Sequence, residues 1–336
     1  MNATMGKAMM RCFAGDALDG LESFTLRTVP IPEPGPGEVR LRVEATAFGY
    51  VDGLIARGGY QLKPALPYTA GAEIVGIVDA VGADVPEDIV IGQQMATWLL
   101  ARGGGAADHV LVDQDWLVPV PPALDPAAVA SLLLDYLTAY YALFDRGALK
   151  PGETVLVLAA AGGIGSAAVD LAVQAGAHVI AAASTPEKRS RAIARGAAAA
   201  IDYLAEDWRD ELKRTQPGAG IDVIFDPVAG ATFEPAFRSL GKGGRHLILG
   251  FAGGDIPRLP ANLPLLKNGS LIGADARYLI ESDLPRAKAI WRTLFALLEA
   301  GAITPPEISA WPLDAAQEAL GQLMDRGKVG KLVLLP

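Results

Sequence analysis

The chain has 336 residues, a length that exceeds what one hydrophobic core usually organises, and it therefore predicts two domains. Its 29 Lys and Arg against 38 Asp and Glu leave a net charge of −9, which argues against nucleic acid or an anionic membrane surface as a partner. A single cysteine, Cys12, excludes an intramolecular disulfide bond and, with only three histidines, a Cys- or His-rich structural zinc site.

The N-terminal segment MNATMGKAMMRCFAGDALDG lacks the sustained apolar region of a secretory signal. No glycine-poor apolar run approaches the ~20 residues that a membrane helix needs. We therefore expect a cytoplasmic protein without a membrane-spanning segment, acting on small molecules.

The first third of the chain has the pattern of short strands. Residues 38–50, 72–82 and 108–120 are rich in β-branched side chains, and turns with Pro and Gly such as PIPEPGPGE separate them. This pattern predicts an antiparallel, barrel-like domain. Helical spacing follows in residues 127–144, AAVASLLLDYLTAYYALF.

Strands and helices then alternate as far as about residue 251. Apolar strand-like segments such as TVLVLAA, HVIAAAS, IDVIFDPV and GRHLILGF are separated by helical ones such as GSAAVDLAVQAG and PEKRSRAIARG. This alternation predicts parallel strands with crossover helices, the α/β doubly wound sheet of a Rossmann domain.

A third pattern begins near residue 272. Residues 285–301 and 314–327 have the spacing of amphipathic helices, and KLVLLP reads as a closing strand outside the alternation. We therefore expect a catalytic domain formed by residues 1–126 and 272–336, with a nucleotide-binding domain, residues 127–271, inserted between its parts.

The turn AAGGIG lies between the strand TVLVLAA and the helix that follows it. Gly162 would let the backbone approach a pyrophosphate, Gly165 would let the helix pack on the strand, and the helix N-terminus offers free N–H groups to the anion. The full GxGxxG pattern places its first glycine at position 160, where this chain has Ala160. The turn predicts a dinucleotide site, with a tight turn that binds no ligand as the alternative.

The end of the second strand predicts which dinucleotide binds. An NAD-specific site places Asp or Glu there, and this chain has Ser184, followed by Lys188 and Arg189, which would neutralise a 2′-phosphate. We expect NADPH. In an alternative reading, STPE only starts a helix, with Ser184 as its N-cap and Glu187 completing a capping box.

Taken together, these motifs resemble those of the medium-chain dehydrogenase/reductase superfamily, and within it the zinc-independent quinone oxidoreductases related to zeta-crystallin. The resemblance covers nearly the whole chain. It implies a GroES-like β-barrel catalytic domain, a Rossmann NADP-binding domain, and a homodimer in which SLIGADARY pairs with its twofold mate. It rests on VPIPEPGPGEVRLRVEATAFGYVD, LPYTAGAEIVGIVDAVG, SLLLDYLTAYYAL, LKPGETVLVLAAAGGIGSAAVDLAVQAGAHVIAAASTPEKR, IDVIFDPVAG and GKLVL.

Zinc-dependent alcohol dehydrogenases of this superfamily carry GHE where this chain has Gly71, Ala72 and Glu73, and a cysteine-rich lobe that has no counterpart here. We therefore expect no metal and no alcohol oxidation through a zinc alkoxide. The remaining chemistry is hydride transfer from NADPH to a quinone or an activated enone. One alternative is a 2-alkenal or enoyl-thioester reductase, and another is a non-catalytic NADPH-binding protein of the crystallin kind.

The resemblance implies a set of cofactor contacts, most of them in the predicted Rossmann domain. For several of these residues a structural role is the alternative: an exposed lysine at 188, a loop cap at Tyr203, core packing at Phe251 and a bond to the preceding helical turn at Thr138. The predicted cofactor contacts are Thr138, Gly162, Gly163, Ile164, Gly165, Ser184, Lys188, Tyr203, Gly250 and Phe251.

The substrate side matches the family less well. Many members have Asn where this chain has Gly49. Tyr60 matches a tyrosine beside the nicotinamide, so Tyr60 and Thr138 are the predicted catalytic residues; Tyr60 would donate a hydrogen bond or a proton to the acceptor, or serve only as a lid that excludes water. We expect structural roles for Asp52, bonding a turn, and for Glu73, in a salt bridge or turn.

Two histidines, His109 and His246, are interpreted as isolated from any acidic or cysteine group that would act with them in catalysis or metal binding. We therefore expect both to be structural.

Overall fold

A computed structural model describes residues 8–100, 102–218, 220–324 and 330–336. The chain forms two compact units: unit 1 contains residues 1–134, 291–299 and 305–336, and unit 2 contains residues 135–290 and 300–304. The predicted boundaries at 126 and 272 are therefore corrected to 134 and 290. Helix α2 packs against strands of unit 1, and the segment after residue 272 continues from a strand of the unit 2 sheet.

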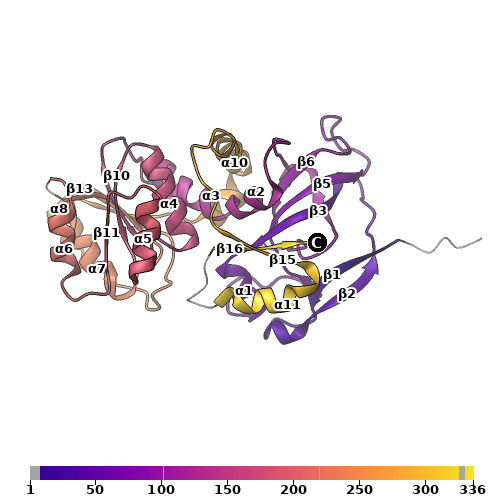
Figure 1. The fold of residues 1–336 in the computed structure, drawn as a ribbon, viewed down its shortest axis with the longest axis horizontal. Helices are drawn as coiled ribbons and strands as arrows, with labels where there is room; N and C mark the ends of the chain where they lie inside the picture. Colours follow the sequence, from indigo (N-terminus) through magenta and orange to yellow (C-terminus); the bar gives the residue numbers. More distant parts are fainter. Residues whose placement is uncertain (1–7, 101, 219, 325–329) are drawn as a thin grey trace, which may run out of the picture. The chain divides into compact units, whose positions relative to one another are not determined.

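A seven-stranded sheet forms most of unit 1, with the order β15-β16-β3-β5-β6-β8 and β7 paired to β3 (Figure 1). The strands from the first third of the chain pair antiparallel, as predicted, and β16 also pairs antiparallel with β3; only β15 and β16 are parallel. Its strands are β3 (Glu38–Phe48), β5 (Glu73–Val81), β6 (Gln94–Trp98), β7 (His109–Asp113), β8 (Val118–Pro119), β15 (Ile308–Pro312) and β16 (Lys331–Leu335).

Alternation of side chains along β3 gives this sheet its core. Val39, Leu41 and Val43 point to one face and are fully or almost fully buried, because successive side chains of a strand point to opposite faces. They form a cluster with Ile74 and Val78 of the neighbouring β5 and with side chains of β6 and β7.

A smaller three-stranded sheet and short helices complete unit 1. The sheet has the order β2-β1-β4, from β1 (Met9–Gly15), β2 (Phe24–Pro30) and β4 (Tyr68–Thr69). The helices are α1 (Tyr50–Ala56), α2 (Pro126–Leu132) and α11 (Ala316–Gly321). The helix predicted over 314–327 ends earlier, and its residues 325–327 lie outside the described part of the chain.

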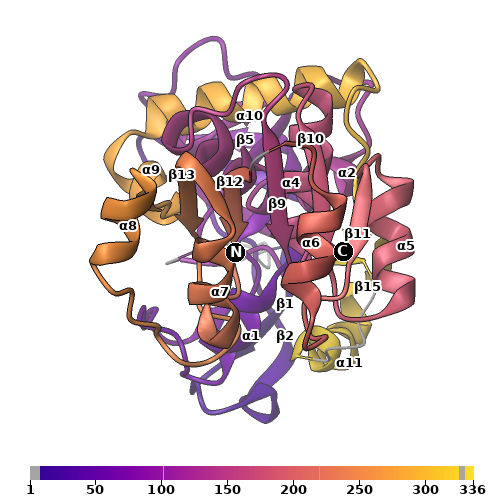
Figure 2. The same ribbon diagram turned by 90° about the vertical axis from the view of Figure 1, so that its left-hand side faces the viewer.

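Unit 2 contains a six-stranded, all-parallel sheet with the order β11-β10-β9-β12-β13-β14 (Figure 2). This is the strand order 3-2-1-4-5-6 of the dinucleotide-binding doubly wound fold, as the alternation predicts. Its strands are β9 (Thr154–Leu158), β10 (His178–Ala182), β11 (Ala199–Ile201), β12 (Ile221–Asp226), β13 (Leu240–Ile248) and β14 (Ser270–Gly273). All residues of the central strand β9 are buried, as a strand covered on both faces requires.

Helices cover both faces of this sheet; in Figure 1, α6, α7 and α8 lie on one side and α4 and α5 on the other. Helix α3 packs on α4 and continues into a π-helix at residues 141–146. Their bounds are α3 (Asp135–Tyr140), α4 (Gly163–Gln174), α5 (Pro186–Ala194), α6 (Trp208–Thr215), α7 (Phe233–Arg238), α8 (Asn262–Lys267) and α9 (Ala276–Ser282), and α10 (Leu284–Glu299) contains the boundary at 290.

Within SLIGADARY only Ser270–Gly273 is a strand, because Asp275 caps the N-terminus of α9 by accepting from the backbone N–H groups of Arg277 and Tyr278. In the part of the chain that the structure describes, no single helix is long and apolar enough to cross a membrane. Residues 126–132 and 135–146 pass that test only as a bent pair.

Candidate functional site in the nucleotide-binding unit

The glycine turn joins the buried strand β9 to α4, as predicted. Gly162 is the N-cap of α4 and has no side chain to bond the helix, and its N–H donates to the carbonyl oxygen of Ala159 at 2.9 Å. The first N–H groups of a helix have no intrahelical partner, so those of α4 are available to a ligand. Both Gly162 and Gly163 are exposed at this point.

The three glycines have different physical reasons to lack a side chain. A Cβ at Gly165 would lie 2.2 Å from the carbonyl oxygen of Ala159, and one at Gly163 would lie 2.4 Å from Oδ2 of Asp135. These two glycines are required by packing within the protein. At Gly162 the nearest atom would be 3.4 Å away, so the space above this residue is open to an incoming group.

Helix α5 begins one residue later than the capping alternative assumed. Its N-cap is Thr185, whose Oγ1 accepts from the N–H of Lys188 at 3.3 Å, and the Glu187 side chain bonds that of Thr185. That alternative role for Ser184 is therefore wrong, and this partly buried residue stands between the end of β10 and the helix cap.

Arg189 does not contribute the free positive charge that the sequence predicted. Its Nη1 lies 2.9 Å from Oδ2 of Asp202 and donates to the carbonyl oxygen of Ala183 at 3.0 Å. Asp202 is on the turn after β11, a partner that sequence proximity could not reveal. Lys188, on the same turn of α5 and partly buried, remains the candidate for a 2′-phosphate.

Two further predicted contacts, Tyr203 and Phe251, differ in their surroundings. Tyr203 is partly buried and packs on the core cluster formed with α6, α7 and α8. Phe251 is 45% exposed, so the alternative of core packing is wrong for this residue. It lies with Gly250 on the loop that follows β13.

A buried pair, Asp226 and His246, anchors this region and was missed by the sequence analysis. His246 Nε2 lies 2.8 Å from Asp226 Oδ2, and neither side chain has any exposure. Asp226 Oδ1 also accepts from the N–H groups of Val228 and Ala229, at 2.8 and 2.7 Å. Ala229 has a positive φ of 54°, so this carboxylate holds a turn that few residues other than glycine adopt.

That turn is in contact with the loop after β13. The N–H of Ala252 donates to the carbonyl oxygen of Pro227 at 3.2 Å, and the N–H of Gly253 donates to that of Val228 at 2.8 Å. The pair of Asp226 and His246 therefore holds, through these bonds, the segment that carries Phe251.

Thr138 lies on α3 and is 6% exposed. Among the described residues, no hydrogen bond partner of its hydroxyl is recorded, so the alternative of a bond to the preceding turn is not seen. The helix changes to π-helical geometry at Tyr141, three residues later. Such π segments occur frequently at functional sites.

Candidate substrate-side residues in the catalytic unit

Glu73 is buried in an ion pair, which confirms its expected structural role. Its Oε1 lies 2.8 Å from Nζ of Lys331, and Oε2 accepts from the N–H of Leu134 at 2.9 Å. Both charged side chains are at most 5% exposed. Removal of one partner from such a pair costs far more than the pair itself contributes, because a buried charge is left without compensation.

Gly49 follows the last residue of β3, is the N-cap of α1 and lies beside this ion pair. A Cβ at this position would lie 3.7 Å from Lys331 Nζ and 3.9 Å from Glu73 Oε1. The N–H of Gly49 donates to Oδ2 of Asp52 at 2.8 Å, which confirms the expected role of Asp52 in bonding a turn. The position held by Asn in many family members thus faces two charged side chains.

Tyr60, the predicted substrate-side residue, lies partly buried in the loop after α1. His109, on β7, was expected to have no acidic partner, but its Nε2 lies 3.1 Å from Oδ2 of Asp79 on β5. Both histidines singled out in the sequence therefore pair with a carboxylate from another strand. In the ranges that the structure describes, no three His, Cys, Asp or Glu side chains form a group able to hold a metal ion.

The strand order 3-2-1-4-5-6 and the glycine turn between β9 and α4 define a dinucleotide-binding domain of the Rossmann class. Residues 35–122 match the alcohol dehydrogenase GroES-like domain, and residues 163–292 match the zinc-binding dehydrogenase family. These matches and the relatives described next show that the chain belongs to the quinone oxidoreductase family of the medium-chain dehydrogenase/reductase superfamily.

Quinone oxidoreductase-like protein 2 of Rattus norvegicus is 37% identical to this chain, over 93% of this chain and 89% of that protein. The quinone oxidoreductase of Sus scrofa is 31% identical, over 98% of this chain and 99% of that protein. The crystal structure of a probable oxidoreductase from Mycobacterium abscessus has a TM-score of 0.85 and 33% identity, covering 98% of this chain and all of that one. The predicted combination of a GroES-like domain and a Rossmann domain is thereby confirmed.

Proposed function

We propose that this protein is a zinc-independent, NADPH-dependent oxidoreductase that transfers hydride to a quinone or an activated enone. The glycine turn carries the proposal. It joins a buried parallel strand to a helix whose first N–H groups are free, and the space at Gly162 is open. The relative from Sus scrofa is named as a quinone oxidoreductase, and it matches this chain over nearly its whole length. This similarity supports a quinone as the acceptor.

The residues of unit 2 fit a nicotinamide dinucleotide with a 2′-phosphate. The helix N-terminus of α4 would bind the pyrophosphate, with Gly162, Gly163, Ile164 and Gly165 around it. Ser184 carries no charge that would repel the 2′-phosphate, and Lys188 would neutralise it. Tyr203, Gly250 and Phe251 would line the remainder of the site.

The bound cofactor supplies a hydride from its nicotinamide ring. In our proposal the Tyr60 hydroxyl donates a hydrogen bond to the acceptor oxygen as negative charge develops there, and Tyr60 or solvent provides the proton. Thr138 contributes a hydroxyl with no recorded partner in the described residues and would orient the nicotinamide. Positioning of the reactants supplies most of the acceleration.

The absence of zinc from the reaction is part of the proposal. Ala72 stands where zinc-dependent relatives have a histidine ligand, and its neighbour Glu73 is in an ion pair with Lys331. A metal needs deprotonated, uncommitted ligands, and this carboxylate is already compensated by an ammonium group. Chelator treatment should therefore leave the activity unchanged.

We also propose a homodimer formed along β14. This strand is at the edge of the unit 2 sheet, and an uncovered edge presents unpaired backbone groups. Leu271 on β14 is exposed, as are Leu265 and Leu266 on α8 and Tyr278 on α9, the helices before and after β14 in the chain. Exposed apolar side chains that gather at one place mark interaction surfaces.

The test follows NADPH absorbance with purified protein and three acceptors in parallel: a quinone, a short 2-alkenal and a crotonyl thioester, each repeated with NADH. Oxidation of NADPH by the quinone, faster than that of NADH, is the expected result. Activity on the alkenal or thioester alone would replace the proposal with an ene-reductase. No activity with any acceptor, despite NADPH binding, would indicate a non-catalytic binding protein.

A further inference from the structure

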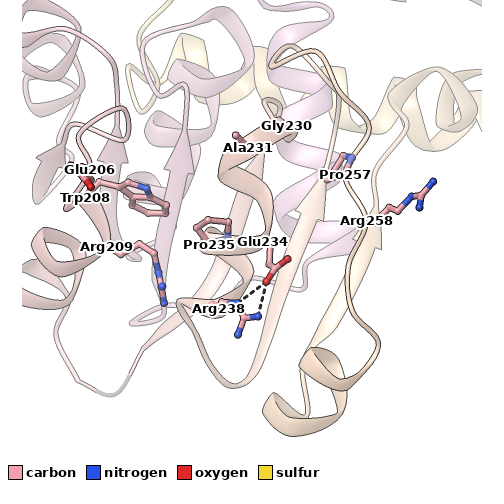
Figure 3. Close-up of a pocket in the computed structure, with 10 residues that line it drawn as sticks. All are labelled: Glu206, Trp208, Arg209, Gly230, Ala231, Glu234, Pro235, Arg238, Pro257 and Arg258. Carbon is pink, nitrogen blue, oxygen red and sulfur yellow. Dashed lines mark hydrogen bonds and ion pairs between the residues drawn. The ribbon is translucent and has the colours of Figure 1, made fainter.

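A pocket of about 590 Å³ opens on unit 2 (Figure 3), and none of its lining residues is among those predicted to bind the cofactor, although Gly230 adjoins the loop that carries Phe251. Its volume is within the range of small-molecule sites. The walls come from the start of α6, from α7 and the turn before it, and from the segment at 257–258. The lining residues are Glu206, Trp208, Arg209, Gly230, Ala231, Glu234, Pro235, Arg238, Pro257 and Arg258.

Positive charge exceeds negative charge in this pocket, although the whole chain is acidic. Figure 3 shows the guanidinium groups of Arg209 and Arg238 on the same side, below the rings of Trp208 and Pro235. Arg258 extends away from them and is exposed. The guanidinium groups of Arg209 and Arg238 are therefore the candidate binding groups.

Few of the donors of these arginines are used within the protein. Nε of Arg209 makes one long bond, 3.4 Å, to Oγ of Ser239. Over the described residues, no carboxylate lies within ion-pair distance of Arg209. Arg238 donates from Nε and Nη2 to a single oxygen, Oε1 of Glu234, at 2.8 and 2.6 Å, which leaves its Nη1 without a recorded acceptor in the same part of the chain.

A third cation, Lys267, is close enough to Arg209 and Arg238 to be repelled by them. Lys267, at the end of α8, bonds the carbonyl oxygen of Leu240. Burial lowers the pKa of Lys267, and repulsion from Arg209 and Arg238 lowers it further. The charges of Arg209, Arg238 and Lys267 thus repel one another. Among the described residues, the only carboxylate in an ion pair with any of the three is Glu234, which pairs with Arg238. An anion would relieve this repulsion.

The opposite wall of the pocket is apolar. Trp208 is almost fully buried in the core beneath α6, and it contributes an aromatic surface next to Pro235. Ala231 and Pro257 add to the same lining. The pocket thus combines a planar apolar wall with guanidinium forks, the groups that bind phosphate most effectively.

We propose that this pocket is a second ligand site, distinct from the cofactor site, that binds a small organic phosphate with a flat apolar body. Arg209 and Arg238 bind the phosphate, and the apolar body lies against Trp208 and Pro235. The inference is independent of the proposed function, because none of its residues is among the predicted cofactor or substrate contacts.

The first test is a titration of the full-length protein with phenyl phosphate, measured by isothermal titration calorimetry, with inorganic phosphate and neutral phenol as comparison probes. Each titration is run without NADPH and with saturating NADPH. Phenyl phosphate is expected to bind more tightly than either comparison probe, and equally well in both conditions. Displacement of phenyl phosphate by NADPH would place the phosphate in the cofactor site and overturn the inference. If NADPH itself does not bind, the titration without NADPH decides whether phenyl phosphate binds more tightly than the comparison probes.

Variants identify the pocket. Arg209→Gln is expected to weaken phenyl phosphate binding about tenfold, because a charge-assisted hydrogen bond is lost. Glu234→Gln should strengthen it several-fold, because Arg238 is released from a competing carboxylate. Arg214→Gln, on the same helix but outside the pocket, is the matched control and should change nothing.

The inference is overturned if the protein binds phenyl phosphate no better than phenol, or if Arg209→Gln and Arg214→Gln have equal effects. The opposite signs expected for Arg209→Gln and Glu234→Gln also separate binding from a loss of folding, since a misfolded variant would not gain affinity.

Discussion

Gly162 and Gly165 lie in one turn, yet they should respond differently to substitution. Gly162 is exposed, and a Cβ added there would make only an ordinary contact, 3.4 Å from the carbonyl oxygen of Ala159. For Gly162→Val we therefore expect the melting temperature to stay near that of the parent while the KM for NADPH rises at least tenfold. Gly165→Ala forces a Cβ against the carbonyl oxygen of Ala159 and should lower the melting temperature by several degrees. Thermal unfolding and initial rates on both variants check this contrast. An unchanged KM in Gly162→Val would show that the space serves no ligand.

Lys188 should set the preference for the phosphorylated cofactor, because the charge of Arg189 is offset by Asp202. We expect Lys188→Ala to lower kcat/KM for NADPH about tenfold, the loss of one charge-assisted hydrogen bond, with little change for NADH. The control is Arg191→Ala, an exposed residue on the same helix. Equal losses with NADPH and NADH would remove Lys188 from the 2′-phosphate site.

At the scale of elements, the ion pair of Glu73 and Lys331 joins β5 to β16 across the end of β3. Lys331→Met leaves a carboxylate buried without its partner and is expected to cost about 3–5 kcal/mol of unfolding free energy. The double variant Glu73→Gln with Lys331→Met should recover a large part of that loss. Denaturant unfolding of both single variants and the double variant measures the coupling. Simple additivity of the two single effects would contradict this account of the pair.

The contact between Asp226 and His246 joins β12 to β13 and holds the turn that bonds the loop with Phe251. His246→Leu should therefore lower the unfolding free energy by about 2 kcal/mol, the value of a hydrogen bond to a charged group, and raise the KM for NADPH. His178→Leu, at the opposite end of the sheet on β10, should leave that KM unchanged. If His246→Leu lowers stability without affecting KM, the pair has no role in forming the site.

For the whole molecule, the edge strand β14 predicts the oligomeric state. Leu271→Lys places a charge on an exposed apolar position of that edge and should convert a dimer to a monomer, measured by light scattering across a range of concentrations. Ile193→Lys, an equally exposed position on α5, is the control and should remain dimeric. A monomeric parent protein would rule out the proposed dimer.

Features of the fold that are formed by residues close together in the chain could be predicted from the sequence, and contacts between distant segments could not. The parallel sheet of unit 2 and its glycine turn were predicted because a buried strand, a glycine cluster and a helix are neighbours in the chain. Contacts between distant segments were not predicted. Glu73 and Lys331, Asp226 and His246, and Arg189 and Asp202 meet only after strands have paired.

The domain boundaries were misplaced for a related reason. A change of composition near residues 126 and 272 marks a change in local pattern, whereas a unit is defined by where each helix packs. The N-cap of α5 could not be identified from the sequence for a similar reason. Ser184 and Thr185 are both suitable N-cap residues, and only the structure identifies Thr185 as the one that is used.

The place of β16 in the unit 1 sheet has a consequence for biosynthesis. This strand lies between β15 and β3, yet it follows β3 by about 280 residues, which a ribosome needs roughly 15–60 s to add. During that interval residues 46–48 at the end of β3 lack the partner that β16 will provide, while unit 2, nearly continuous in sequence, can already fold. We expect the nascent chain to acquire its nucleotide-binding half first and to depend on chaperones for the other half until translation reaches β16.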